Sequence, residues 1–166
     1  MVYKHAAPAL PLVTERMAVA AGGAHTVMVG EDGRVFASGY NRDGELGMGD
    51  NQNRLTPTRV AVLPPLSGPV RQVAAGGYHT GIVTEAGDLL MCGDGRYGRL
   101  GLGDEDDRTT PTLVARAVFD GEAVLMVACG EEHTVVVTEG GGVYTFGNGE
   151  YGRLGHGDEE HQLVPR

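Results

Sequence analysis

Residues 39–50 read GYNRDGELGMGD, a glycine-rich stretch whose pattern occurs twice more along the chain. Residues 93–104 read GDGRYGRLGLGD and residues 147–158 read GNGEYGRLGHGD, so each copy lies 54 residues after the one before. The same interval separates three His-Thr pairs, which begin at His25, His79 and His133. Identities this numerous at one period identify a tandem repeat, and the repeat is therefore the unit in which the fold must be explained.

Each repeat is predicted to contain four short β-strands separated by turns. Short apolar runs that end at a glycine predict the first strand, at residues 19–21, 73–75 and 127–129. Apolar segments rich in β-branched residues predict the second, at residues 25–29, 79–83 and 133–137. Beyond a glycine hairpin, the third is expected at residues 35–38, 89–92 and 143–146. An outer strand is expected just after a proline, at residues 59–63 and 113–117.

This pattern lacks helical periodicity and indicates an all-β fold, in which four-stranded antiparallel blades stack as in a β-propeller. We expect about three blades, from repeats at residues 17–70, 71–124 and 125–166, and no helix in the core. Residues 1–16 are expected to be a leader that adds a strand from a preceding partial unit. Three blades cannot close a ring, so the chain is a fragment of a longer protein, which we favour, or shares a ring with other chains, or forms an open arc.

Composition argues against several classes of function. The 166 residues carry a net charge of −9 and include 13 Lys and Arg, so no basic cluster is expected to bind nucleic acid. No apolar run approaches about 20 residues, and no signal peptide is apparent, so no membrane segment is expected. Cys92 and Cys129 are too few for a disulfide framework; we expect both to be reduced in an intracellular protein of the cytoplasm or nucleus.

The repeated histidines allow two interpretations. His25, His79 and His133 could form a three-imidazole metal site, because neutral imidazole is a common metal ligand. The structural interpretation is favoured, because the repeat places one histidine at the same depth in each blade, where it can hydrogen-bond backbone between strands. We therefore expect no metal and no cofactor.

Two further motifs, a glycine pattern and a repeated aspartate, resemble ligand sites in sequence but lack the context that those sites need. Residues 93–98 and 147–152 match G-x-G-x-x-G, but neither opens a helix, as a dinucleotide site requires. Structural roles in turns are expected for the repeated glycines Gly39, Gly93 and Gly147. Structural roles in Asx turns are expected for Asp50, Asp104 and Asp158, whose surroundings lack the spacing of a calcium loop. No catalytic constellation recurs outside the scaffold, so we expect no enzyme activity.

Binding contacts are expected where the repeats differ, in the loop that follows the third strand. Equivalent loops should gather on one face, and Arg and Tyr are the side chains that most often anchor protein interfaces. The alternative is an ordinary solvated loop whose tyrosines pack on the neighbouring blade. The candidate protein-binding residues are Arg42, Asp43, Arg96, Tyr97, Arg99, Glu150, Tyr151 and Arg153.

The order G-x-x-H-T, E-x-G, G-x-N-x-x-G-E-L-G-x-G-D and a later proline resembles the regulator of chromosome condensation repeat, over residues 17–166. The resemblance implies a ring of about seven blades, of which this chain would supply part. The resemblance is compatible with a non-catalytic protein-interaction scaffold, which is the function that we favour. It also implies a rival function, guanine-nucleotide exchange on a Ran-type small GTPase, but that activity uses a protruding β-wedge for which equal 54-residue steps leave no insertion.

Two other relatives of this fold bear on function. A bacterial β-lactamase inhibitor of similar fold suggests a third possibility, the blocking of an enzyme's active site. The plant ultraviolet-B photoreceptors use tryptophan as chromophore, and this chain contains no Trp, so the resemblance is not expected to extend to light sensing.

Overall fold

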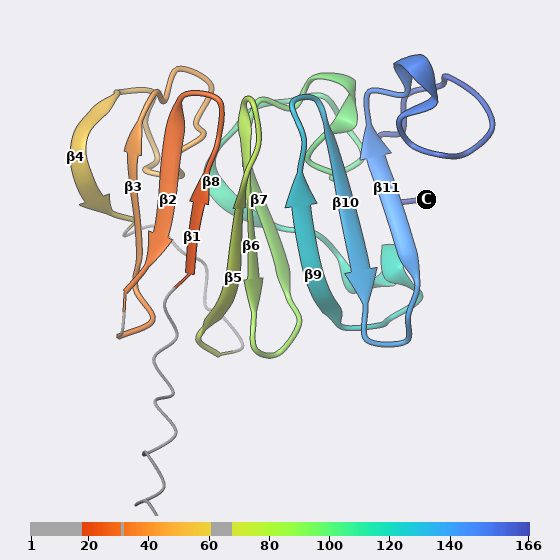
Figure 1. Cartoon of the computed structure of the whole chain (residues 1–166), viewed down its shortest axis with the longest axis horizontal. Helices are drawn as coiled ribbons and strands as arrows, with labels where there is room; N and C mark the ends of the chain where they lie inside the picture. The colour runs from red at the N-terminus through yellow and green to blue at the C-terminus, as the bar shows by residue number, and fades with distance from the viewer. Residues whose placement is uncertain (1–17, 31, 61–67) are drawn as a thin grey trace, which may run out of the picture.

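The computed structural model describes residues 18–30, 32–60 and 68–166, which form three antiparallel sheets standing side by side (Figure 1). We call the sheets blades 1, 2 and 3. Blade 1 pairs, in order, β1 (Ala18–Ala21), β2 (His25–Val29), β3 (Val35–Gly39) and β4 (Arg54–Arg59). Blade 2 pairs β5 (Val70–Ala75), β6 (His79–Thr84), β7 (Leu89–Gly93) and β8 (Arg108–Leu113). The predicted all-β fold is confirmed.

Blade 3 pairs β9 (Val124–Cys129), β10 (His133–Thr138) and β11 (Val143–Gly147). Beyond β11, Gly147 and Gln162 exchange two backbone hydrogen bonds of 2.9 and 3.0 Å. This segment therefore occupies the place of the outer strand. The predicted first three strands of every repeat overlap the observed ones, whereas the expected leader, residues 1–16, lies outside the described residues.

The position predicted for the outer strand is wrong. β4 and β8 begin at Arg54 and Arg108, five residues before the segments expected at 59–63 and 113–117, of which 61–63 lie outside the described residues. Each strand contains its proline instead of following it. In β4, residues 55–57 bulge out between the pairs Gly39–Arg54 and Ala37–Thr58, so the missing N–H of proline costs no hydrogen bond in the ladder.

Three short 3-10 turns lie in the loops that follow strands: η1 (Arg96–Gly98) after β7, η2 (Arg116–Phe119) after β8 and η3 (Glu150–Gly152) after β11. The expectation of no helix in the core is wrong for η2, because its Phe119 is buried between blades 2 and 3 and meets the Tyr144 ring edge-on at 5.3 Å. No helix within the described ranges is long and apolar enough to cross a membrane.

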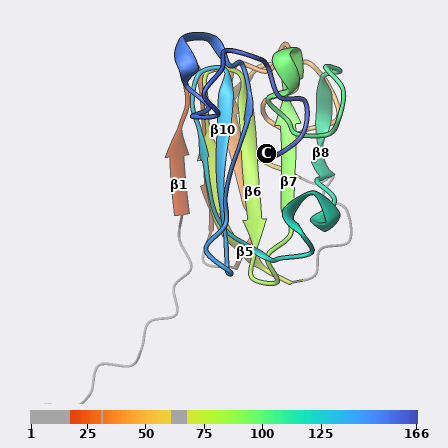
Figure 2. The ribbon, with the colours of Figure 1, turned by 90° about the vertical axis from the view of Figure 1, so that its right-hand side faces the viewer.

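The blades bury apolar side chains in two layers. One layer lies between blades 1 and 2 and includes Val27, Ile82 and Leu90; the other lies between blades 2 and 3. Figure 2, turned by 90°, shows the strands of successive blades overlapping, with β1 at one side and β8 at the other. Because blade 2 is covered on both sides, β6 and β7 are buried at every position, whereas β2 alternates.

The repeated histidines link neighbouring blades. The His25 Nε2 atom lies 2.8 Å from the Thr80 hydroxyl, which donates to the Glu45 carbonyl at 2.7 Å. His79 and Thr134 repeat this arrangement at 2.8 Å. Because the threonine proton goes to the carbonyl, the imidazole must donate from Nε2. The partner is thus a hydroxyl of the next blade, and the backbone partner that was expected is wrong.

Candidate protein-interaction face

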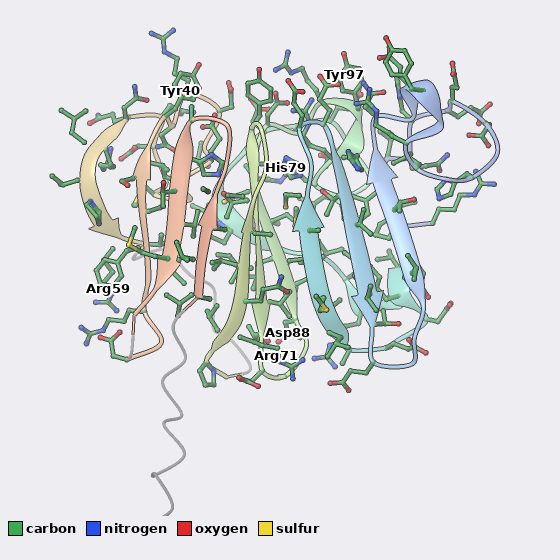
Figure 3. All side chains as sticks on the ribbon, viewed as in Figure 1. Tyr40, Arg59, Arg71, His79, Asp88 and Tyr97 are labelled. Carbon is green, nitrogen blue, oxygen red and sulfur yellow. The ribbon has the colours of Figure 1, made fainter. Side chains whose placement is uncertain are left out.

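The loops that follow the third strands lie at one end of all three blades (Figure 1). We call this end the loop face and define it by residues 40–53, 94–107 and 148–161. Figure 3 shows Tyr40 and Tyr97 at this end and Arg71 and Asp88 at the opposite end. The repeat therefore brings the variable loops to one surface, as their equivalent positions require.

Each loop is closed by hydrogen bonds between equivalent positions. The closing bonds run from the backbone N–H groups of Asn41, Gly95 and Gly149 to the side chains of Asn53, Asp107 and His161, at 2.9, 2.9 and 3.1 Å. Each loop begins at a glycine with positive φ, at Gly39 (112°), Gly93 (109°) and Gly147 (108°). A left-handed backbone of this kind favours glycine, and it turns the chain out of the strand.

The repeated aspartates organise the second half of each loop. One carboxylate oxygen accepts the backbone N–H two residues further on, in Asp50 (2.9 Å), Asp104 (3.1 Å) and Asp158 (3.1 Å). The other oxygen faces an arginine at the edge of the blade, as in the Asp50–Arg54 pair at 2.6 Å. These contacts are those of an Asx turn and fix the loop backbone.

Two tyrosine–arginine pairs stand on the loop face. Tyr97 and Tyr151 both have φ of 61°, a left-handed conformation that is uncommon for a bulky side chain. In each loop the arginine two residues later lies with its guanidinium carbon 5.6 Å from the tyrosine ring, in Arg99 and in Arg153. The strained backbone thus holds an aromatic ring over a cation, a contact that stabilises both groups.

The two pairs differ in exposure. Arg99 is fully buried between the rings of Tyr97 and Tyr78, and it is therefore not the surface contact that was expected. Arg153 is half-buried, and the Tyr151 residue beside it is 86% exposed. Arg42 and Glu150 are exposed, Asp43 is half-buried, and the side chain of Arg96 is 64% exposed.

Charge on the loop face centres on Asp94. Its carboxylate binds Arg96, with Nε 2.8 Å from Oδ2, and lies 3.4 Å from the Arg99 guanidinium. Burial alone would raise the pKa of Asp94, but the hydrogen bonds from Arg96 and the charge of Arg99 outweigh it and hold that pKa below its usual value. Partial burial, together with the carboxylates of Asp94 and Asp107, raises the pKa of Asp43.

The residue before the second and third repeated histidines supports the loop face, a role that the sequence predictions missed. Tyr78 packs on Arg99 at 5.7 Å, and Glu132 pairs with Arg153 at 3.2 Å and also accepts a bond from Asn148 at 2.9 Å. A signal was present in the sequence, because this position differs between the second and third repeats although the loop residue 21 positions later, Arg99 or Arg153, is the same. Blades 2 and 3 therefore support the equivalent arginine in different ways.

No three His, Cys, Asp or Glu side chains gather as a possible metal site in the part of the chain that the structure describes. A hollow of about 560 Å³ lies on the inner side of the blades, where the first hairpin of each blade turns. Among the described residues, glycines and alanines form most of its lining, including Gly22, Gly76 and Gly130, and Glu131 is the one that carries a charge. This lining offers little chemistry, which leaves the loop face as the candidate site.

Comparison with known proteins identifies the repeat. The model of the regulator of chromosome condensation (RCC1) repeat matches residues 32–83, 86–137 and 140–166. The chain is 44% identical over 147 residues to the ultraviolet-B receptor UVR8 of Arabidopsis thaliana, covering 89% of this chain and 32% of the receptor. It is 40% identical over 149 residues to the probable E3 ubiquitin-protein ligase HERC4 of Mus musculus, covering 89% of this chain and 14% of the ligase.

Solved structures agree with this match. Prp20p of Saccharomyces cerevisiae superposes with a TM-score of 0.78 at 27% identity, covering 89% of this chain and 36% of Prp20p. Human WBSCR16 gives a TM-score of 0.77 at 29% identity, covering 89% of this chain and 38% of that protein. The chain thus spans about a third or less of the curated relatives named above, and its three blades match part of larger propellers.

Proposed function

Because the chain belongs to the regulator of chromosome condensation repeat family, we propose that it is a non-catalytic protein-interaction scaffold whose contact surface is the loop face. The observation that carries this proposal is the pair of tyrosines held in left-handed backbone on one surface, with arginines beneath them. Rigid aromatic and arginine side chains lose little entropy on binding and are frequent anchors of protein interfaces.

Relatives support a protein as the partner. The solved structure of yeast Prp20p is described together with its binding to Gsp1p and histones, and a second structure shows yeast RCC1 (Prp20) bound to Kap60. Gsp1p, histones and Kap60 are partners of yeast Prp20, and this chain spans about a third of the Prp20 structures. By the same analogy we assign the chain an intracellular place, in the cytoplasm or nucleus.

The negative charge of the chain indicates the kind of protein surface that the loop face would bind. The chain carries a net charge of −9, and the loop face ends in acidic runs at residues 104–107 and 158–160. Arg96 and Arg99 pair with Asp94, and Asp104 and Asp158 pair with arginines at the edge of their blades. The other carboxylates of the acidic runs, at residues 105–107 and 159–160, give the rim of the face a negative charge. A basic protein surface would be complementary to this rim, and complementarity of this kind accelerates association at low salt.

Replacing exposed side chains of the loop face should abolish partner binding. We expect the triple variant Arg42→Ala/Arg96→Ala/Tyr151→Ala to lose partners that the parent chain captures from a cell extract, as measured by affinity purification and quantitative mass spectrometry. The three side chains are exposed, but Arg96 also pairs with the buried Asp94, so circular dichroism of the variant checks that the fold is retained. The control, Arg34→Ala, removes an exposed arginine that precedes β3 and should keep every partner. Unchanged capture by the triple variant would contradict the proposal.

Guanine-nucleotide exchange is the second candidate function, favoured by the superposition on Prp20p. We expect the chain not to accelerate release of a fluorescent guanine nucleotide from a Ran-type GTPase, because an even 54-residue period leaves no insertion to act on the GTPase. The measurement is the release rate at increasing chain concentration, with an active full-length exchange factor as the positive control. A rate that rises with chain concentration would establish exchange and remove the non-catalytic proposal.

A further inference from the structure

The loop of blade 3, residues 148–161, is closed by a different kind of acceptor from those of the other two loops. In blades 1 and 2 the closing N–H donates to a side-chain oxygen, of Asn53 or Asp107, at 2.9 Å. In blade 3 the acceptor is Nδ1 of His161, 3.1 Å from the Gly149 nitrogen. A backbone N–H can only donate, so Nδ1 accepts and the ring proton is on Nε2. The repeat thus places an amide, a carboxylate and an imidazole at the same position.

Of these three groups, only the imidazole loses its acceptor when it takes up a proton. An amide does not titrate, and a carboxyl group that gains a proton still has an acceptor oxygen, whereas both nitrogens of an imidazolium are donors. Histidine is the side chain that changes charge between about pH 5 and 8. Gly149 is buried, so loss of the acceptor would leave a buried N–H unpaired and facing a second donor.

The closing bond carries more weight in blade 3 than in the other blades. Blade 1 has a second bond across its loop, from the Asn51 amide to the Arg42 carbonyl at 2.6 Å. Blade 2 has one from the Tyr97 N–H to the Glu105 carboxylate at 2.8 Å. In the described part of blade 3, no second hydrogen bond of this kind crosses the loop. The closure of this loop therefore depends on the state of one imidazole.

The surroundings of His161 offer other contacts to a charged ring. The ring is exposed and can take up a proton from solvent. Tyr97 is the titratable side chain that faces it from blade 2, at 4.8 Å between ring centroids, and the Arg99 guanidinium lies 5.6 Å from the same tyrosine. Carboxylates, which attract an imidazolium, stand on both loops that meet here. They are Glu105, which holds the Tyr97 N–H, and Glu159 and Glu160, which precede the histidine.

We infer that the loop of blade 3 is closed at neutral pH and opens in mild acid, because protonation of His161 removes the acceptor of the Gly149 N–H. Opening would also withdraw the imidazole from Tyr97, one of the candidate contact residues, so the shape of the loop face would change with pH. The inference concerns the loop itself and does not depend on whether the loop face binds a protein.

The place of blade 3 in the chain does not create this arrangement. Asp107, the equivalent of His161 in the middle blade, is exposed as well. The closing bond lies within one loop, and the tyrosine that faces the imidazole comes from blade 2. Both contacts are therefore made between described residues inside the chain.

Amide hydrogen exchange of the 166-residue chain, followed by nuclear magnetic resonance, tests this inference. The closing N–H groups of Asn41, Gly95 and Gly149 are compared at about pH 7.5 and 5.5, after correction for the intrinsic exchange rate of each amide. Protection of Gly149 should fall by about tenfold in acid, the effect of losing one hydrogen bond. Asn41 and Gly95 keep their acceptors, so their protection should change by less than about twofold.

Two variants identify the imidazole as the cause. His161→Asn places in blade 3 the residue that closes the loop of blade 1, and an amide keeps an acceptor oxygen, so Gly149 should stay protected at both pH values. His161→Ala has no acceptor, so Gly149 should exchange about tenfold faster than in the parent already at pH 7.5, with no further change in acid. The dispersion of the same spectra establishes that each variant is folded.

Three outcomes would overturn the inference. The first is equal protection of Gly149 at both pH values in the parent chain. The second is a fall shared by all three closing N–H groups, which would indicate a general loss of structure. The third is a fall at Gly149 that persists in the His161→Asn variant.

Discussion

Lowering the pH from 7 to 5 is expected to remove about 4 kcal/mol from the free energy of unfolding, in two contributions of about 2 kcal/mol from His25 and His79. Burial lowers the pKa of His25 to about 4. Burial, reinforced by the nearby Arg99 charge, lowers the pKa of His79 to about 3. Both rings therefore stay neutral in the folded chain at pH 5, whereas in the unfolded chain they titrate near 6.5.

The direction of the effect follows from proton uptake. Below pH 6.5 the unfolded chain binds protons that the folded chain does not, so stability is present above that pH and falls as the pH drops toward 4. The geometry explains why the folded rings resist protonation. Nε2 of each ring already donates to a threonine, and Nδ1 of His79 is buried without a hydrogen-bond partner among the described residues. A second N–H there would be a buried, unpaired charge.

Urea unfolding followed by far-ultraviolet circular dichroism at pH 7 and pH 5 measures this loss. The matched variant is His79→Gln, which keeps a hydrogen-bond donor but cannot titrate. It should be less stable than the parent at pH 7 because packing changes, yet its loss between the two pH values should be about 2 kcal/mol smaller than the parent's. Equal stability of the parent at both pH values, or an unchanged loss in the variant, would contradict the role given to the buried rings.

The repeat made most of the fold predictable, because one period fixes the equivalence of positions in all three blades. The second strand of blade 1, residues 25–29, coincides with β2. The outer strand was misplaced because its Thr-Pro-Thr core lacks the apolar alternation by which strands are recognised, and a proline there suggested a strand start. Phe119 entered the core from a short turn that has no periodicity of its own.

The candidate site was only partly predictable, since a period says which positions are equivalent but not which way they face. Arg99 and Arg153 are equivalent by sequence, yet only Arg99 is fully buried. The difference comes from the residue 21 positions earlier in the sequence: Tyr78 packs on Arg99 in addition to Tyr97, whereas Glu132 pairs with Arg153 beside the exposed Tyr151. The threonine partners of His25 and His79 were missed for the same reason, because each lies 55 residues away in the next blade.

Replacing Gly76 by alanine should destabilise the chain by about 3 kcal/mol, through a clash between blades. A Cβ atom at Gly76 would lie 2.2 Å from the Gly130 carbonyl oxygen and 2.7 Å from the His79 ring. That carbonyl belongs to the backbone of blade 3 and accepts the Gly77 N–H, so it cannot move without disturbing the junction. Gly76 does not have positive φ, and its glycine is therefore required by space and not by backbone conformation.

Gly130→Ala is the matched control for this prediction, because Gly130 occupies the same place in the repeat and no described blade lies against its outer side. There the three atoms nearest to the Cβ all belong to the ring of His133, which is half-buried and can rotate away, so we expect a loss of about 1 kcal/mol. Urea unfolding followed by far-ultraviolet circular dichroism compares the two variants. Equal losses would show that the hairpin itself, and not the approach of the next blade, requires glycine.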